Sequence, residues 1–594
     1  MSNVRRGVDA DVGVVVDFVR AEAETGRLEF TRPSEVIVVE RLEDVRDALA
    51  RVEACARDGY YAVGFISYDS APAFDSALRV PGRAATPLLW FGIFEAPTRA
   101  DTAAAPGTDI ESRLKGAEWT PHVAHEQYDD AINAIRRGIV AGDFYQVNHT
   151  VRLLAPLSDS SRAMYESLRA AQPDSYSMFV DVGRFAIMSV SPELFFARQG
   201  REITTRPMKG TIARGRSVVE DRAAASTLAA SEKDRAENVM IVDLVRNDLG
   251  RIAQVGSVRV SQLFEVERHP TVWQMTSTVT ATLRDDATLP NIFGTLFPSG
   301  SIVGAPKIAA AEFIAEYERA PRGVYCGAMG IVKPGGDCVF NVAIRTLIVD
   351  RETGVAEYGV GGGITIDSTT TGEYDELLAK AVVLRGADAP FELFETMRLS
   401  NGVFDRRERH VRRICSSADY FDFAAVERSA NDALDHLAAQ RSDGDHRVRL
   451  IAMSNGSARC DATPIASRSA ASQTMRYAIA TSPVSSRDRF LFHKTTRRDV
   501  YESRRREHPH ADEIILINER GELTECSIGN LVIELDGVKC TPPVDCGLLP
   551  GIFREQLIEH DVIVERVLYP VDLARASHVW LINSLREWVA LIAL

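Results

Sequence analysis

The chain has 594 residues, 45% of them hydrophobic and 26% charged. This is the composition of folded globular domains, and the length is too great for one hydrophobic core. A formal net charge of −14 would repel a phosphate backbone or an anionic membrane surface, so we expect no nucleic acid and no membrane as a partner. Eight cysteines lie far apart without a C-x-x-C pair, which predicts reduced thiols. Together these features favour a cytoplasmic protein with more than one domain.

The first two thirds of the sequence alternate between strand-like and helical patterns. The runs AVGFISY, RFAIMSV and CVFNVAIRTLIV are typical of strands, and YDDAINAIRRGIVAGD and KDRAENVMIVDLVRNDLG of helices. We therefore predict one large α+β domain over residues 1–387. A helical segment then ends at Gly386, before ADAP and a new strand-like run, FELFETMRL. This pattern predicts a boundary at 387/388 and a smaller α/β domain over residues 388–594.

Two predicted helices of the first domain carry acidic residues three positions apart: Asp234 with Glu237, and Glu373 with Glu376. This spacing places each pair on one helix face, where the carboxylates would suit Mg²⁺. Taken alone, either pair is more often a solvated helix face.

Two cations and a run of glycines lie in apolar surroundings. A buried cation is costly unless it is paired, so Arg345 of FNVAIRT calls for a carboxylate from the protein or from a substrate. The run GVGGGI, residues 359–364, is either a plain turn or a source of backbone N–H groups, from Gly362 and Gly363, for a carboxylate. The neighbouring residues alone assign no role to Lys209 of TRPMKGT.

In chain order, the segments DFYQVN, SVSPELFF, TRPMKGT, AENVMIVDLVRNDLGRI, GSIVGAPK, YCGAMGI, FNVAIRT, GVGGGI and GEYDELLAK resemble the chorismate-utilising enzymes, the family of anthranilate, isochorismate and aminodeoxychorismate synthases. The resemblance spans about residues 120–385 and implies a Mg²⁺-dependent site for chorismate, a dicarboxylate. By motif match the metal site would comprise Glu237, Glu376, Glu373 and Asp234. The resemblance further implies that Arg345 and Tyr325 hold the enolpyruvyl carboxylate. Glu193 would protonate the departing 4-hydroxyl.

The resemblance also gives Lys209 a role. Aminodeoxychorismate synthases carry a lysine where relatives that make anthranilate carry a small residue, and its amine attacks C2 before ammonia adds at C4. Gln146 stands where water-using relatives place a lysine, so ammonia is the expected nucleophile. The chain lacks the G-x-C-x-G-x-Q motif of a glutaminase, and we expect a separate glutaminase subunit to supply the ammonia. Met275 stands where many relatives have histidine.

The second domain carries LFETMRL, RHVRRICSSADYF, FHKTTRRDVY, LTECSIGNLV, LLPGIFRE and LINSLREW. Over about residues 391–590 these segments resemble the fold-type IV pyridoxal-phosphate enzymes, which include aminotransferases and aminodeoxychorismate lyase. The resemblance makes Lys494 the lysine that binds the cofactor and Glu525 the partner of the pyridinium nitrogen. The phosphate would be held by Arg413, Ile552, Phe553 and Ser584, the middle two through backbone N–H groups. The usual opening strand of this fold is missing, which predicts that the first domain or a second subunit, as in a homodimer, completes it.

The combination of the two domains predicts a bifunctional enzyme of folate biosynthesis. The first domain would convert chorismate and ammonia to 4-amino-4-deoxychorismate, and the second would release pyruvate to give 4-aminobenzoate. One alternative is an anthranilate synthase-like domain joined to an amino-acid aminotransferase, against which Lys209 argues. Another is a chorismate-binding regulatory protein with a degenerate site, against which the retained site residues argue.

Overall fold

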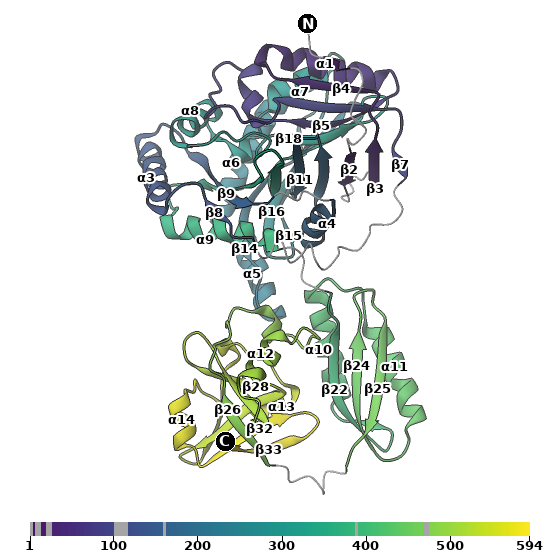
Figure 1. Ribbon diagram of the computed structural model, residues 1–594, viewed down its shortest axis with the longest axis vertical. Helices are drawn as coiled ribbons and strands as arrows, with labels where there is room; N and C mark the ends of the chain where they lie inside the picture. Colours follow the sequence, from purple (N-terminus) through teal and green to yellow (C-terminus); the bar gives the residue numbers. More distant parts are fainter. Residues whose placement is uncertain are drawn as a thin grey trace. The chain divides into compact units, whose positions relative to one another are not determined.

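The computed structural model describes residues 4–5, 13–18, 26–99, 117–157, 162–385, 390–466 and 474–594 (Figure 1). The chain forms two compact units. The N-terminal unit comprises Met1–Ala213 and Ala225–Asp388, and the C-terminal unit comprises Arg214–Ala224 and Ala389–Leu594. The predicted boundary at 387/388 lies outside the described residues. The segment Arg214–Ala224, here called the arm, was predicted inside the first domain but belongs to the C-terminal unit.

The mixture of helices and sheets confirms the predicted fold class. All eight cysteines are free. Among the helices that the structure describes, none is long and apolar enough to cross a membrane.

Two large antiparallel sheets form the N-terminal unit. Over the described residues the first has eleven strands, in the spatial order β1 (Val4–Arg5), β4 (Glu35–Val39), β6 (Leu89–Phe94), β5 (Tyr61–Ile66), β18 (Ala328–Val332), β19 (Cys338–Val342), β12 (Leu194–Gln199), β13 (Glu202–Arg206), β16 (Val272–Thr282) and β14 (Met208–Ala213), with β15 (Arg259–Arg268) beside β16. The second, of ten described strands, runs β17 (Gly304–Ala305), β9 (Gln146–Pro156), β21 (Val355–Ile364), β20 (Thr346–Asp350), β11 (Phe185–Ser191), β10 (Tyr176–Asp181), β2 (Gly13–Phe18), β3 (Gly26–Thr31) and β7 (Thr98–Arg99), with β8 (Thr120–Pro121) beside β9.

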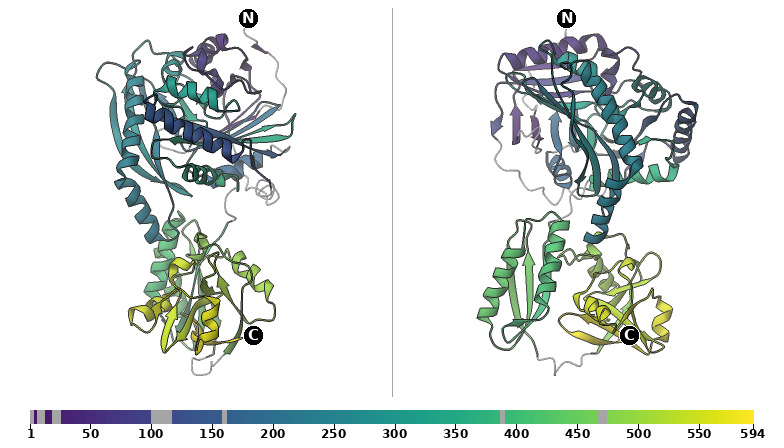
Figure 2. Two further views of the ribbon diagram at one scale, coloured as in Figure 1. Left: turned by 90° about the vertical axis from the view of Figure 1, so that its left-hand side faces the viewer. Right: turned by 180° about the vertical axis from the view of Figure 1, so that it is seen from behind.

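These two sheets share a buried core. One cluster joins Val16 of β2 to Phe65 of β5 and Met329 of β18, so the inner faces of the sheets pack on each other. The helices of this unit are α1 (Val45–Arg57), α3 (His125–Ala141), α4 (Arg162–Ala171), α6 (Glu232–Gly250), α7 (Leu289–Leu296), α8 (Lys307–Tyr317) and α9 (Thr370–Lys380), while α5 (Val218–Ala230) begins in the arm. Helix α6 lies along β14 and β16, as Figure 2 shows.

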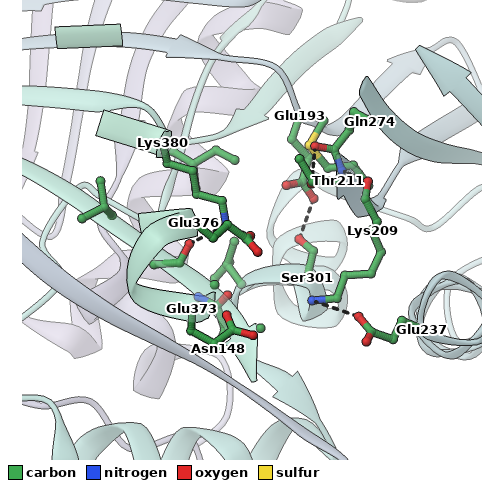
Figure 3. Close-up of a pocket in the computed structure, with 18 of the residues that line it drawn as sticks. Asn148, Glu193, Lys209, Thr211, Glu237, Gln274, Ser301, Glu373, Glu376 and Lys380 are labelled. Atoms are coloured by element: carbon green, nitrogen blue, oxygen red, sulfur yellow. Dashed lines mark hydrogen bonds and ion pairs between the residues drawn. The ribbon is translucent and has the colours of Figure 1, made fainter. Parts of the chain in front are cut away.

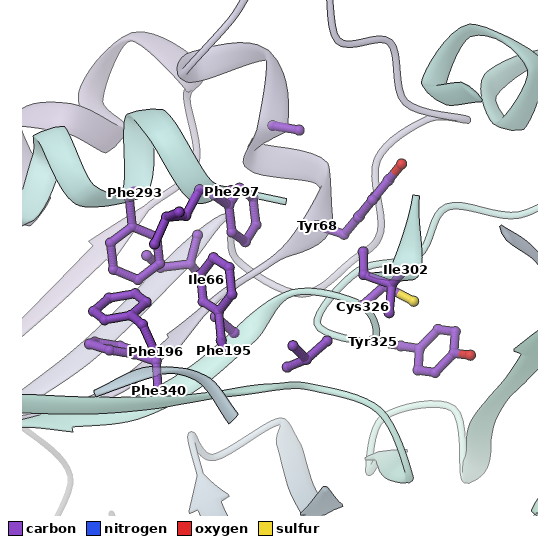
Figure 4. Close-up of a cluster of buried hydrophobic side chains, with 14 of the residues drawn as sticks. Ile66, Tyr68, Phe195, Phe196, Phe293, Phe297, Ile302, Tyr325, Cys326 and Phe340 are labelled. Carbon is purple, nitrogen blue, oxygen red and sulfur yellow. The ribbon is translucent and has the colours of Figure 1, made fainter. Parts of the chain in front are cut away.

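A cluster of phenylalanines anchors the loop after α7 (Figure 4). Phe293 of α7 lies 5.4 Å from Phe196 and 5.0 Å from Phe340, measured between ring centroids. Phe297 belongs to the same core, which extends to Ile302 and Tyr325. Because buried aromatic rings contribute large contact areas, this cluster fixes the short turn Gly300–Ile302 that follows.

The C-terminal unit contains two smaller sheets. One runs β23 (Val403–Phe404), β22 (Leu393–Ser400), β24 (Asp445–Ala452) and β25 (Ala458–Pro464), and the other runs β28 (Leu523–Cys526), β27 (Glu513–Ile517), β26 (Thr474–Ile479), β33 (Glu587–Ala593), β32 (His578–Asn583), β29 (Gly529–Leu535), β30 (Val538–Thr541) and β31 (Val564–Glu565). The helices are α10 (Arg407–Tyr420), α11 (Glu427–Gln440), α12 (Asp499–Glu507), α13 (Ile552–Glu559) and α14 (Pro570–Arg575). Strands β22 and β23 are joined at Asn401 and Gly402, which both have positive φ, as a tight hairpin requires.

Candidate active sites

A pocket of about 350 Å³ lies in the N-terminal unit. The predicted site residues that line it are Glu193, Lys209, Asp234, Glu237, Tyr325, Arg345, Gly362, Gly363, Glu373 and Glu376, and Figure 3 shows several of them pointing into it from different elements. Gln146, the remaining prediction for this domain, lies immediately behind Gly363, because a Cβ atom added to that glycine would be 2.4 Å from its Nε2.

Lys209 lies on an irregular part of β14. The register of β14 with β16 shifts between Met208 and Thr211, and Gly210 has a φ of +98°; such bulges redirect side chains. The Nζ atom of Lys209 lies 3.9 Å from Oε2 of Glu237. Burial lowers the pKa of Lys209 below its usual value, and Glu237 opposes this only in part. A larger fraction of Lys209 is therefore neutral, as a nucleophile requires.

Because the glycines of β21 have no side chains, side chains from other elements pack directly against the backbone of this strand. A Cβ atom on Gly363 would be 2.1 Å from Nζ of Lys209, and one on Gly359 would be 2.4 Å from the ring of Tyr325. The run is thus a strand, paired with β9, and the alternative of a plain turn is wrong.

The two predicted backbone donors face opposite ways. Gly362 pairs with His149 of β9, and Lys380 donates to the carbonyl of Gly361 from the other side. Backbone groups alternate in direction along a strand, so the N–H of Gly363 faces the pocket. The N–H of Gly362 faces β9, which corrects the prediction that both N–H groups are available.

Glu193 has the properties of a general acid. Its side chain is buried, and the hydroxyl of Ser301 donates a hydrogen bond to Oε1 over 2.5 Å. Burial raises its pKa to about 7, while the Ser301 hydrogen bond and Lys209 act in the opposite direction. Near neutral pH a substantial fraction of Glu193 is therefore protonated and able to donate.

Arg322 fixes two segments of the pocket wall. Its guanidinium is fully buried, forms an ion pair with Glu318 and donates to the carbonyls of Ile302 at 2.7 Å and Asn148 at 2.8 Å. Charge-assisted hydrogen bonds of this kind are short and strong. The positions of Ser301 and Asn148, which both line the pocket, depend on this buried pair.

Arg345 has a positive φ of 51°, a conformation that costs about 1 kcal/mol or more for a residue other than glycine. In the part of the chain that the structure describes, no carboxylate forms an ion pair with it, although it lines the pocket. Tyr325 lies nearby with its ring beneath the guanidinium of Arg152, 4.8 Å away. An arginine held in this way without a protein partner is suited to a substrate carboxylate.

The four acidic side chains line the pocket from two helices. Glu237 and Asp234 belong to α6, and Glu373 and Glu376 to α9. Burial raises the pKa of Glu237 and of Glu373, whereas Lys380, 2.6 Å from Glu376, lowers the pKa of Glu376.

Among the described residues, no three His, Cys, Asp or Glu side chains are close enough to form a metal site by themselves. Mg²⁺ commonly uses one or two carboxylates together with water and substrate oxygens. The donors present therefore fit this ion.

Several pocket residues were not predicted. Gln274 of β16 donates from Nε2 to the carbonyl of Gly210 over 2.7 Å and accepts from the hydroxyl of Thr211 over 2.9 Å. Met275, which was taken as the position of interest, is fully buried outside the pocket lining. Side chains alternate along a strand, so Gln274 and Met275 point to opposite faces of β16, and the tertiary structure shows that the face of Gln274 meets the pocket.

A second pocket, of about 490 Å³, lies in the C-terminal unit. It contains the predicted residues Lys494, Glu525, Arg413, Ile552 and Ser584. The ring of Phe553 does not line it but packs against Trp588 and beneath Arg406. The prediction for this residue concerned its backbone N–H group, which lies in the first turn of α13.

Lys494 and Glu525 are both buried in this pocket. Burial, together with the positive charge of Arg413, lowers the pKa of Lys494 to about 8. Burial raises the pKa of Glu525 to about 7, although the Tyr501 hydroxyl donates to its Oε1 over 2.7 Å. A carboxyl group held in this way fits a pyridinium nitrogen, whose positive charge would favour the ionised form.

The start of α13 forms the other end of the pocket. Gly551 precedes Ile552, and a Cβ atom on Gly551 would be 1.9 Å from Oδ1 of Asn530. Arg413 reaches the same place by donating to the carbonyl of Pro550, while Glu395 holds its guanidinium at 2.8 and 2.7 Å. Free N–H groups at a helix start and a nearby arginine fit a phosphate.

The pocket is also strongly basic in a way that no motif indicated. Arg447 and Arg449 lie two residues apart on β24, which places both on one face of the strand. Arg498 and Arg586 line the pocket as well. Arg449 stacks over the ring of Phe394 at 4.4 Å. These arginines suit a substrate with carboxylates in addition to the cofactor phosphate.

Comparison with known proteins finds one family match in each half of the chain. Residues 18–386 match the model of the chorismate binding enzymes, and residues 392–593 match that of amino-transferase class IV. The chain belongs to the chorismate-binding enzymes and carries a class IV aminotransferase domain as its second part.

The relatives include two activities. The chain is 40% identical over 264 residues to aminodeoxychorismate synthase component 1 of Escherichia coli, covering 44% of this chain and 58% of that protein. It is 38% identical over 320 residues to anthranilate synthase component 1 of Streptomyces coelicolor, covering 53% and 60%. A solved structure of anthranilate synthase component I from Streptococcus pneumoniae has 26% identity and a TM-score of 0.51, covering 64% of this chain and 92% of that one. The chain spans about half the length of the curated relatives it matches.

Proposed function

We propose that the protein makes 4-aminobenzoate for folate biosynthesis in two steps. The N-terminal unit aminates chorismate at C4 to give 4-amino-4-deoxychorismate, and the C-terminal unit removes pyruvate from that product. The observation that supports the first step most directly is Lys209, whose buried amine lies in the pocket close to Gln146 and Gly363. Relatives of similar identity carry both synthase names, so the choice between amination at C4 and at C2 rests on this residue.

In the first step, Nζ of Lys209 bonds to C2 of chorismate while the 4-hydroxyl leaves with a proton from Glu193. Ammonia then bonds to C4 and expels the lysine. Arg345 and Tyr325 hold the enolpyruvyl carboxylate. Mg²⁺, when bound by Glu237 and Glu376, neutralises the charge of a substrate carboxylate. A separate glutaminase subunit supplies the ammonia.

In the second step, Lys494 takes the proton from C4 of the product, and pyruvate leaves as the ring becomes aromatic. A pKa of about 8 leaves part of Lys494 neutral near pH 7 and hence able to act as a base. Pyridoxal phosphate, when bound against Glu525, Arg413 and the start of α13, supplies the electron sink for this step. Arg447 and Arg449 bind the carboxylates of the substrate, and a homodimer through this unit would complete the missing opening strand.

The test is a covalent trap. The protein is incubated with chorismate and Mg²⁺ without ammonia, and its intact mass is measured. We expect a mass increase on the wild type that Lys209→Ala abolishes. The control, Lys333→Ala, changes a lysine of the same unit that does not line the pocket, and it should keep the adduct. An adduct that persists in Lys209→Ala would remove the nucleophile assignment.

A further inference from the structure

The arm was predicted as part of the first domain, but in the structure it belongs to the C-terminal unit. By sequence it follows directly on β14, which carries Lys209, and it lies inside the range that matches the chorismate binding enzymes. Its contacts nevertheless place it in the C-terminal unit. It therefore requires an explanation that neither enzymatic step supplies.

The arm has a defined internal structure. Arg214 and the N–H of Gly215 both donate to Oδ1 of Asp221, at 2.7 and 2.9 Å. Gly215 has no room for a side chain, because a Cβ atom there would be 2.1 Å from the backbone nitrogen of Asp221. Arg214 and Asp221 are each about 5% exposed in their side chains. The arm is thus a folded turn with a buried ion pair.

The arm holds the end of α10. The hydroxyl of Tyr420 donates to the carbonyl of Gly215 over 2.7 Å, and Arg214 donates to the carbonyl of Tyr420 over 3.0 Å. The guanidinium of Arg214 also lies 4.8 Å above the Tyr420 ring. Because α10 carries Arg413, these contacts fix the helix that supplies a candidate phosphate ligand.

The arm also holds the residue next to Lys494. His493 is buried between the Tyr420 ring, 4.3 Å away, and the arm, where its Nε2 lies 3.2 Å from the carbonyl of Arg216. Burial lowers the pKa of His493 to about 4, so the ring is neutral. Nε2 then donates to Arg216, while Nδ1 accepts from Ser417 over 2.9 Å.

Three further contacts fasten the arm at Arg216. Its side chain donates to Asp545 and to the carbonyl of Ser486, and it lies 4.9 Å above the ring of Phe492. Phe492, His493 and Lys494 are consecutive, so the arm contacts the two residues before the candidate cofactor lysine.

We propose that the arm is a positioning element of the pyridoxal-phosphate site, which sets the place of Lys494 through His493 and that of Arg413 through the end of α10. The proposal rests on the proposed function only in that the C-terminal unit binds this cofactor. It implies that the second catalytic unit is incomplete when cut at the predicted boundary, because residues 214–224 are part of it.

The test uses the full chain and three variants. Tyr420→Phe removes only the hydroxyl that donates to Gly215, and Arg216→Ala removes the contacts with Asp545, Ser486 and Phe492. Val219→Ala is the control, since Val219 lies in the arm but is 80% exposed. Pyridoxal phosphate is titrated into each apoprotein, and the visible absorbance band of the lysine-bound cofactor gives the Kd. A second titration, with pH, gives the midpoint at which this band changes.

We expect Tyr420→Phe and Arg216→Ala to raise the Kd of pyridoxal phosphate by about 3- to 10-fold, the effect of losing one or two buried hydrogen bonds. Both variants should also shift the pH midpoint of the band. Val219→Ala should match the wild type in both measurements. A change in the pH midpoint would not follow from a general loss of stability. If both variants keep the wild-type Kd and midpoint, the proposal is wrong. If the wild type itself gives no such band, the cofactor assignment fails and the arm proposal with it. Should Arg216→Ala not fold, Tyr420→Phe, which loses one oxygen atom, decides the question.

Discussion

The hydroxyl of Ser301 donates a hydrogen bond to the buried carboxyl of Glu193 over 2.5 Å. This bond favours the ionised form of Glu193, whereas burial favours the protonated form and raises the pKa to about 7. If Glu193 donates its proton to the leaving hydroxyl, formation of the amine should fall as the pH rises through about 7. Ser301→Ala removes the hydrogen bond, so the pKa should rise and the fall should move to higher pH. Initial rates between pH 5.5 and 9 measure this, with Ser261→Ala, outside the pocket lining, as the control. An unchanged profile in Ser301→Ala would contradict the role of Glu193.

The same carboxyl group affects folding stability. Its pKa rises from 4.5 in the unfolded chain to about 7 in the folded one, so between these values the folded state binds more protons. Its contribution to the free energy of unfolding is complete below about pH 4.5 and is lost as the pH rises through 7, by about 3 kcal/mol. Glu193→Gln should remove this decline from the denaturation profile of the N-terminal unit. A slope equal to that of the wild type would show that Glu193 is already ionised.

Gly363 should be indispensable because it leaves space for Lys209. A Cβ atom there would overlap Nζ of Lys209 and Nε2 of Gln146, so Gly363→Ala should displace both and reduce covalent trapping of chorismate by at least about 10-fold, as for a misplaced catalytic group. Gly250→Ala is the matched control, since a Cβ atom there meets nothing within 4 Å and the residue has no positive φ. Intact-mass measurement after a timed reaction compares the two; equal trapping would contradict the geometry.

Lys494 should react with pyridoxal phosphate at lower pH than an ordinary lysine. Only the neutral amine reacts, and the pKa of Lys494 is lowered to about 8. The rate at which the apoprotein gains the visible band should therefore rise with pH and level off above about 8. Arg413→Met removes a positive charge close to Lys494, so the pH midpoint of this reaction should rise. Stopped-flow absorbance gives the rates; a midpoint near 10.5, the usual value for lysine, would exclude a buried lysine.

The buried pair of Arg322 and Glu318 should carry much of the local stability. Arg322→Met leaves Glu318 buried without its partner, and such changes cost about 3–5 kcal/mol. Arg246→Met, which removes an exposed ion pair with Asp243, should cost less than about 1 kcal/mol. Unfolding by denaturant is monitored through hydrogen exchange of the backbone amides of β9. This measurement reports the stability of the N-terminal unit separately from that of the rest of the chain. A small change in the free energy of unfolding of Arg322→Met would mean that water takes the place of the guanidinium beside Glu318.

The sequence alone identified both domains, and most of the site residues that it predicted line one of the two pockets, because motifs such as TRPMKGT and GEYDELLAK are specific and lie on separate elements. It could not distinguish a turn from a strand at Gly359–Ile364, since only tertiary contacts show that Tyr325 and Lys209 occupy the space of the missing side chains. The arginines of β24 were missed because their role depends on which strand face meets the pocket. The arm was missed for a related reason: its partners, Tyr420 and His493, lie about two hundred or more residues away in the chain.

The most direct test of the account is the identity of the aromatic product. Purified protein is supplied with chorismate, Mg²⁺, ammonium and pyridoxal phosphate, and the products are separated by chromatography. We expect 4-aminobenzoate with an equimolar amount of pyruvate. Anthranilate in its place would contradict amination at C4 and the role of Lys209.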